Sequence, residues 1–361
     1  MNSWARGLVI FGIVSAAVSQ VATHRSNAFG DPGVTSAVSP STSPVEGILD
    51  HINHYRRLEH LDPLTENQSG SRAAANHARY IVENRLGPGD YIIDSGLVKS
   101  GLSRTTHDEA RGNPWYSVAG ASVATRSNTF TAATIPSDTR PWIDQLMTSP
   151  LSALAVLDPT VASLGYGDYC ADGRCAAVVV YDNNQSRLQL AREFKLMAAN
   201  PLQEYPDSYS GSGEGARKYL KSPIQFPPPD GSFPLSSYDG GREFGDPLFA
   251  CAAYSPPTGL PIVLSLGEEL SEAGAVRLES FSLMDGAQQL ESCGYDAFSY
   301  ANQNSEIQEA GRNILRNTLR WKLAAVVIPR APLKPGHTYT ISMTVASQEY
   351  KWSFKIEPDH Y

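Results

Sequence analysis

Histidine and acidic side chains stand close together at one point of the 361-residue chain, in the run Thr106-His107-Asp108-Glu109. An imidazole with a nearby carboxylate can act in general acid–base chemistry, the carboxylate orienting the ring. A hydrolytic zinc site needs about three protein ligands and an open position. Only Asp108 and Glu109 accompany His107, and sequence neighbours rarely all point at one ion. We therefore expect no cofactor and no metal here, with zinc as the weaker alternative, and predict that His107 and Glu109 hold a loop by hydrogen bonds.

Other chemical patterns are weaker. His51 and His54 lie three residues apart on a predicted helix and could share a metal, but no third ligand has a suitable spacing. An exposed or hydrogen-bonded pair is therefore the favoured interpretation. The patterns GxxxxGK[ST], HExxH and GxSxG are absent, which removes support for phosphate-loop, zinc-protease and nucleophile-elbow chemistry.

Composition excludes several classes of partner. With 41% hydrophobic and 18% charged residues the chain resembles a soluble globular protein. Its net charge is −8 and no run of four Lys or Arg occurs, so we expect no nucleic-acid partner. We expect a monomer.

The N-terminal residues have the layout of an export signal. Arg6 precedes the apolar run LVIFGIVSAAV, and small residues follow up to Ala22. This predicts a signal peptide over residues 1–22, with Ala28 as a second cleavage point and an uncleaved anchor as the alternative. The mature chain would then have no membrane span. Residues 23–43 are polar and rich in Ser, Pro and Gly, which predicts a flexible lead-in.

Four cysteines agree with export, since disulfides persist in oxidising compartments. Three pairings are formally possible. Closeness in sequence favours Cys170–Cys175 and Cys251–Cys293, and four free thiols remain the alternative.

Residue patterns divide the chain into two halves. Helical spacing predicts a helix that begins at Ser43-Pro44 and ends at Asp62-Pro63, and others over 71–84 and 142–147; a β-branched run predicts a buried strand over 176–181. We expect residues 188–199 to form a short helix or the start of a connection. Residues 191–246 are rich in Pro and Gly and predict a linker. Residues 247–361 contain the strand-like runs 261–266, 276–283, 323–328, 338–345 and 350–356, which predict an all-β sandwich.

Six segments between about 45 and 182 resemble the CAP superfamily, the SCP-like domains of cysteine-rich secretory, antigen-five and pathogenesis-related proteins. Each segment is weakly specific by itself, but their common order is fairly specific. In chain order they are Ile48 to Arg57 with Leu61-Asp62-Pro63-Leu64, Ala73 to Tyr80 with its Ala-x-x-His-Ala pattern around His77, Thr106-His107, Tyr116 to Ala124, Ser149 to Ser152, and Leu157 to Gly167.

This resemblance implies a fold and a partly depleted cleft. The expected fold is α+β: a three-layer α-β-α CAP sandwich over 44–190, the linker, and an immunoglobulin-like β-sandwich over 247–361. The family is known for a cleft with two His and two acids that sometimes binds a divalent metal. His107 matches this pattern, whereas Ala121 stands where the family has Glu and Ser152 where it has the second His. Leu146 also replaces a common Trp.

Three functions from different classes follow. The leading one is a secreted, non-catalytic extracellular module, bacterial by the pairing of its domains, that binds a lipid, peptide or glycan near His107, Glu109 and His77. The second is a divergent hydrolase with His107, Glu109 and Ser152 as catalytic residues, a Ser-His-acid arrangement implied by the family geometry. The third is a purely structural protein of the cell surface. We lean away from an enzyme.

Overall fold

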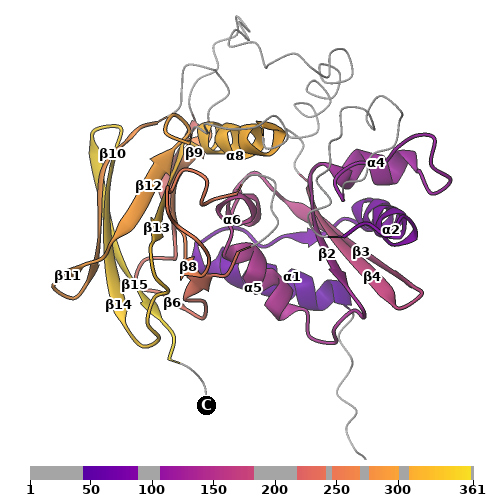
Figure 1. The fold of residues 1–361 in the computed structure, drawn as a ribbon, viewed down its shortest axis with the longest axis horizontal. Coiled ribbons are helices and arrows are strands. Elements are labelled where there is room, and N and C mark those ends of the chain that lie inside the picture. The colour runs from indigo at the N-terminus through magenta and orange to yellow at the C-terminus, as the bar shows by residue number, and fades with distance from the viewer. Residues whose placement is uncertain are drawn as a thin grey trace, which may run out of the picture. The chain divides into compact units, whose positions relative to one another are not determined.

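A computed structural model of the chain describes residues 44–87, 106–182, 218–240, 246–268, 276–300 and 309–358. The described residues all belong to one compact unit (Figure 1). The predicted signal peptide over 1–22, the lead-in over 23–43 and the possible helix over 188–199 lie outside the described residues.

A four-stranded sheet organises the N-terminal half, in the order β1-β3-β4-β2. Strand β1 runs parallel to β3, and the other neighbours are antiparallel. The strands are β1 (Thr65–Glu66), β2 (Ser127–Ala132), β3 (Ser163–Ala171) and β4 (Arg174–Asp182). The predicted buried strand over 176–181 is confirmed as β4, whose β-branched run suits a strand covered on both faces.

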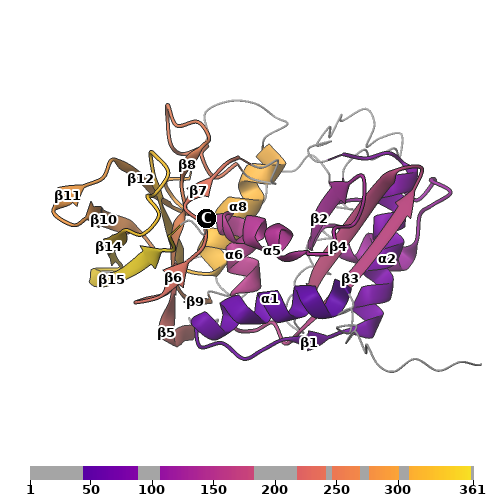
Figure 2. The same cartoon turned by 90° about the horizontal axis from the view of Figure 1, so that it is seen from below.

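Helices cover both faces of this sheet, and the side chains of β4 show how. Ala176, Val178 and Val180 pack in one cluster with the apolar face of α2, while Ala177, Val179 and Tyr181 pack in another with α1, α5 and α6. This two-residue alternation is the period of a strand. Figure 2 shows the sheet between α2 and the α5–α6 pair. The helices are α1 (Pro44–Leu58), α2 (Gln68–Glu83), α4 (Val118–Ala124), α5 (Arg140–Met147) and α6 (Pro150–Val156).

Two glycines let α2 approach the sheet closely. A Cβ atom added to Gly165 would lie 2.3 Å from the backbone carbon of Gly70, and one added to Gly167 would lie 2.1 Å from the backbone nitrogen of Ala75. Both contacts are shorter than real side chains allow, so β3 needs glycine where α2 crosses it.

The C-terminal half is rich in strands, as predicted. One sheet has the order β11-β10-β14-β15-β6, a second has β12-β13-β9-β5, and β7 pairs with β8. The first two sheets face one another, because a Cβ on Gly294 of β12 would lie 2.5 Å from the Phe281 ring of β10. The strands are β5 (Lys218–Phe226), β6 (Ser232–Phe233), β7 (Ser237–Tyr238), β8 (Thr258–Gly259), β9 (Ile262–Glu268), β10 (Leu278–Asp285), β11 (Gln288–Gln289), β12 (Ser292–Asp296), β13 (Ala324–Pro329), β14 (Thr338–Val345) and β15 (Gln348–Ile356).

Two features of this half differ from the sequence expectation. The segment over 191–246 was expected to be a linker, but β5, β6 and β7 lie within it. Strand β5 is held in place by its hydrogen bonds with β9. The strand preference of its own residues is not enough to predict it. A helix also interrupts the expected all-β region, α8 (Glu309–Trp321).

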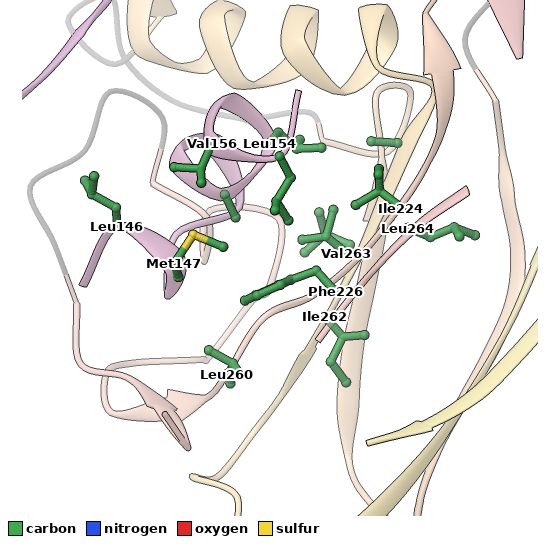
Figure 3. Packing of buried hydrophobic residues seen from close by; sticks show 14 of the residues in the cluster. Leu146, Met147, Leu154, Val156, Ile224, Phe226, Leu260, Ile262, Val263 and Leu264 are labelled. Atoms are coloured by element: carbon green, nitrogen blue, oxygen red, sulfur yellow. The ribbon is translucent and has the colours of Figure 1, made fainter. Parts of the chain in front are cut away.

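The two halves share a continuous hydrophobic core. Figure 3 shows Leu154 and Val156 of α6 packed beside Phe226 of β5 and Val263 of β9. A partly buried ion pair joins the same region, with Lys322 Nζ 2.7 Å from Asp158 Oδ2. The halves are therefore not separated by an open connection at this point.

Both disulfides agree with the pairing favoured from the sequence, Cys170–Cys175 and Cys251–Cys293. The first joins directly opposed residues of β3 and β4. The second ties β12 to the segment after residue 246. Within the described ranges, no helix has the length and hydropathy needed to span a membrane.

Candidate functional site

A polar stripe on α2 holds the loop that contains His107. His77, Tyr80 and Asn84 recur at helical spacing, so they lie on one side of the helix. The Tyr80 hydroxyl accepts a hydrogen bond from the backbone of Ala110 at 3.0 Å, and Asn84 bonds with Asn113. The stripe thus fixes the loop along more than one turn of α2.

His77 and Glu109 form the buried centre of this arrangement. Their exposed fractions are 0% and 4%, and His77 Nδ1 lies 2.9 Å from Glu109 Oε1. His77 Nε2 lies 2.8 Å from the carbonyl oxygen of Thr106, which can only accept, so Nε2 carries a proton. One further proton lies between Nδ1 and the carboxylate. On either atom it leaves the pair with no net charge, which suits a buried site.

The second oxygen of Glu109 secures the start of α4. It accepts a hydrogen bond from the backbone N–H of Ser117 at 2.9 Å, and the Ser117 hydroxyl caps the helix by accepting from Gly120 at 2.8 Å. A Cβ on Gly120 would lie 2.1 Å from Glu109 Oε1. Glycine at this position is therefore what lets the carboxylate reach both partners.

His107 lies next to the end of α4 and is partly buried. Its Nδ1 is 3.3 Å from the carbonyl oxygen of Ala124. Burial, reinforced by the charge of nearby His77, lowers the pKa of His107 to about 4. The ring is therefore neutral at pH 7 and is placed to donate to a backbone carbonyl.

Ser152 lies on α6 with 4% of its surface exposed. Its hydroxyl oxygen accepts a hydrogen bond from the side chain of Asn128 on β2 at 3.0 Å. Ser127, the preceding residue, donates to the same Ala124 carbonyl that His107 contacts. Ser152 and His107 thus both lie near the N-terminal end of β2, each bonded to a different partner there.

The predicted site residues divide into two groups. His77 and Glu109 are hydrogen-bonded directly to one another. His107 instead contacts the carbonyl oxygen of Ala124, and Ser152 bonds with Asn128. The sequence analysis placed Glu109 beside His107 as its orienting acid, but the carboxylate orients His77. The pairing of residues 32 positions apart has no local signal except the polar stripe on α2.

A second histidine cluster lies on the other side of the sheet. His51 Nε2 is 2.5 Å from Asp144 Oδ1, and the Tyr55 hydroxyl donates to the same oxygen at 2.6 Å. The ring of His54 is parallel to that of His51, with centroids 6.0 Å apart. His51 and Asp144 are partly buried and His54 is exposed. The expectation of an exposed or hydrogen-bonded pair fits both rings.

The family model of the cysteine-rich secretory protein family, CAP, matches residues 49–181. This region contains the three layers and the His77–Glu109 pair described above. Residues 49–181 are a CAP domain. The comparison with curated proteins gives no match. The resemblance recognised from six ordered segments is thereby confirmed for the N-terminal half.

The CAP domain of this chain does not fit the divalent metal known from its family. Ala121 on α4 has no ligand atom, and Ser152 on α6 offers a hydroxyl already bonded to Asn128. Glu109 has both oxygens committed to His77 and Ser117. Among the described residues, no three His, Cys, Asp or Glu side chains are grouped so that they could hold a metal.

Proposed function

We propose that this chain is an exported, non-catalytic binding protein whose CAP domain takes up an extracellular ligand. The lipid, peptide and glycan classes named from the sequence all remain candidates, and lipid is the class tested first. The strand-rich C-terminal half would act as an immunoglobulin-like spacer or adhesin. The disulfides support an oxidising compartment such as the cell exterior, and the apolar N-terminal run supports export.

The observation that carries this proposal is the internal saturation of His77 and Glu109. Both ring nitrogens and both carboxylate oxygens have partners within the protein, and both side chains are buried. A general base must lie within hydrogen-bond reach of the proton that it removes from substrate. These contacts favour a structural role in fixing the loop, and commit Glu109, the acid expected for a triad, to His77 and Ser117.

A shallow pocket in the CAP domain, lined by polar and apolar groups in similar measure, is a candidate place for the ligand. It has a volume of about 260 Å³, and apolar residues at the end of α2, including Ile81 and Val82, line it. Ala132 at the end of β2 and Arg174 of β4 complete the opening. Typical pockets for whole small molecules measure roughly 300–1,000 Å³. This one therefore suits part of a larger ligand, such as a segment of an acyl chain whose acidic head contacts Arg174.

Binding to lipid vesicles tests the proposal. We expect the protein without residues 1–22 to co-sediment saturably with vesicles that contain an anionic lipid or fatty acid. Ala132→Phe, which fills the pocket, should weaken this binding at least fivefold. Ala119→Phe on exposed α4 is the matched control and should leave it unchanged.

Enzyme assays provide the opposing outcome. The proposal predicts no ester, peptide or glycoside hydrolysis above background, and vesicle binding that persists in His107→Ala. Hydrolysis by the wild type that His107→Ala abolishes would overturn the non-catalytic assignment. Equal vesicle binding by wild type and Ala132→Phe would exclude the pocket, and parallel panels of peptidoglycan, glycans and peptides would identify a different ligand class.

A further inference from the structure

We propose that His51 and His54 of α1 form a binding site for a divalent transition metal of the copper and zinc class, positioned by Asp144 of α5. This site is separate from the family cleft and independent of the proposed ligand-binding function. It uses two imidazoles, with water in the remaining coordination positions. Imidazole suits copper and zinc better than magnesium or calcium, which prefer oxygen ligands.

The contact with Asp144 orients the His51 ring and fixes which nitrogen is free to bind a metal. The carboxylate can only accept in its ionised form, so His51 Nε2, 2.5 Å away, donates its proton to Asp144. In the neutral ring this leaves the lone pair on Nδ1. Metal-binding histidines commonly donate their other N–H to a carboxylate, which fixes the tautomer and makes the ring a better ligand.

Tyr55 holds Asp144 in place. Its hydroxyl donates to the same Oδ1 at 2.6 Å, and only 2% of the Tyr55 surface is exposed. The Tyr55 ring packs in turn against Phe233, with centroids 5.5 Å apart. The His51 ring is therefore oriented by a chain of contacts that ends in the hydrophobic core, as expected for a built site rather than a loose surface histidine.

The two rings are close enough to share one ion. A metal bound at about 2.0–2.1 Å from one nitrogen of each ring allows ring centroids up to about 6.4 Å apart. The observed separation is 6.0 Å with the rings stacked parallel within 5°, so one ring has to turn before both can point a nitrogen at the same ion. His54 is exposed, so its ring can turn to bring a nitrogen towards Nδ1 of His51.

Acidic groups surround the pair and favour a cation. Asp144 contacts His51. The carboxylate of Glu357 interacts electrostatically with His54, and that of Asp138 with His51. Arg57 opposes them, while Arg140 is engaged with Asp138. Two protein ligands give modest affinity, and the acids add to it by attraction at short range.

Titration of the untagged full chain with Cu²⁺ tests the site. We expect saturable binding of one ion by calorimetry, and electron paramagnetic resonance with nitrogen coupling from two imidazoles. His54→Gln should weaken binding at least tenfold and remove one coupled nitrogen. His337→Gln is the matched control, since His337 is also an exposed ring that contacts an aspartate, Asp285, and it should leave the affinity unchanged.

Asp144→Asn separates a built site from adventitious binding. The substitution removes the charge that orients and polarises His51, and loss of such a partner typically costs about 10–100-fold in metal affinity. Circular dichroism confirms that the variant is folded. Binding that is unaffected by both His54→Gln and Asp144→Asn, or a spectrum with no imidazole coupling, would overturn the proposal.

Discussion

Burial strongly disfavours the charged form of Glu59. It follows the last turn of α1, and its carboxylate accepts a hydrogen bond from the backbone of Gln225 on β5. Its Oε1 is buried without a hydrogen-bond partner. Desolvation outweighs the bond from Gln225 and raises the pKa of Glu59 to about 8. The carboxyl is therefore protonated in the folded protein at pH 7.

A raised carboxyl pKa makes the fold less stable as pH increases. Between pH 4.5 and 8 the unfolded chain has lost the proton that the folded protein keeps, so the free energy of unfolding falls across this window. The upper limit is about 5 kcal/mol, and the partial exposure of the residue reduces it. We expect Glu59→Gln to raise stability at pH 8 and to flatten this slope, as measured by urea unfolding from pH 4.5 to 8. Glu66→Gln, an exposed control, should leave the slope unchanged.

The lowered pKa of His107 predicts the opposite pH dependence of stability, a loss as the solution becomes more acidic. Its pKa is lowered to about 4 by burial and the charge of His77, so the unfolded chain binds a proton that the folded ring refuses. Stability is fully present above pH 6.5 and is lost as pH falls towards 4, by at most about 3 kcal/mol. His107→Gln should remove this part of the acid-side loss. A variant with the same acid-side slope as wild type in urea titrations would show that His107 is protonated in the fold.

Helix α4 depends on an arrangement that glycine makes possible. Replacing Gly with Ala within a helix ordinarily adds up to about 1 kcal/mol of stability. At Gly120 the new Cβ would lie 2.1 Å from Glu109 Oε1 and 2.7 Å from the Ser117 hydroxyl. The carboxylate could move away only by giving up its bonds with His77 and Ser117. The intrinsic helix preference therefore favours Ala at position 120, whereas the local packing disfavours it.

We expect Gly120→Ala to destabilise the protein by about 1–3 kcal/mol. Gly112→Ala, where an added Cβ meets nothing within 4 Å, should change stability by less than about 0.5 kcal/mol. Urea unfolding measures both, and proteolysis of the 106–117 loop reports whether the damage is local. Equal stability of the two variants would contradict the role given to Glu109.

Helices and strands with a clear local residue pattern could be predicted from the sequence, whereas a strand that depends on pairing with a distant strand could not. Helix α2 was predicted because its apolar residues recur at helical spacing, and β14 because its 338–345 run is strand-like and follows a turn sequence. Strand β5 was missed because its residues include Pro223 in a Pro- and Gly-rich region. It is an edge strand whose register shifts between Tyr219 and Ile224, which is where sheets tolerate proline.

The candidate site was predictable in its members but not in their pairing. His77, His107, Glu109 and Ser152 were all named from the sequence. The bond between His77 and Glu109 arises only when the loop folds back on α2. Asp144, which orients His51, is 93 residues away from it in the chain, and no local pattern connects them. Spacing identifies residues able to do chemistry, while the tertiary fold decides which of them meet.

At the scale of the whole molecule, the CAP domain and the strand-rich half stabilise one another. Apolar side chains of α6 lie against β5 and β9 in one cluster of buried residues (Figure 3). Arg56, fully buried, donates to the carbonyl oxygens of Val156 and Asp158 at 2.8 Å each. The Asp158 carboxylate then pairs with Lys322 of the other half. Polar and apolar contacts thus cross the same boundary.

This continuity predicts one cooperative unfolding transition instead of two. Removing a buried Phe costs about 3–5 kcal/mol, so Phe226→Ala at the shared core should lower the midpoint of the entire transition by several degrees. Ile81→Ala, which affects only the α2 face of the CAP sheet, should lower the same transition, because neither half can unfold while the other keeps its core. Calorimetry of the protein without residues 1–22 measures this through the ratio of calorimetric to van't Hoff enthalpy, expected near one. Two resolved transitions, with Phe226→Ala shifting one and Ile81→Ala the other, would mean that the halves fold independently and that the shared cluster is only a contact between them.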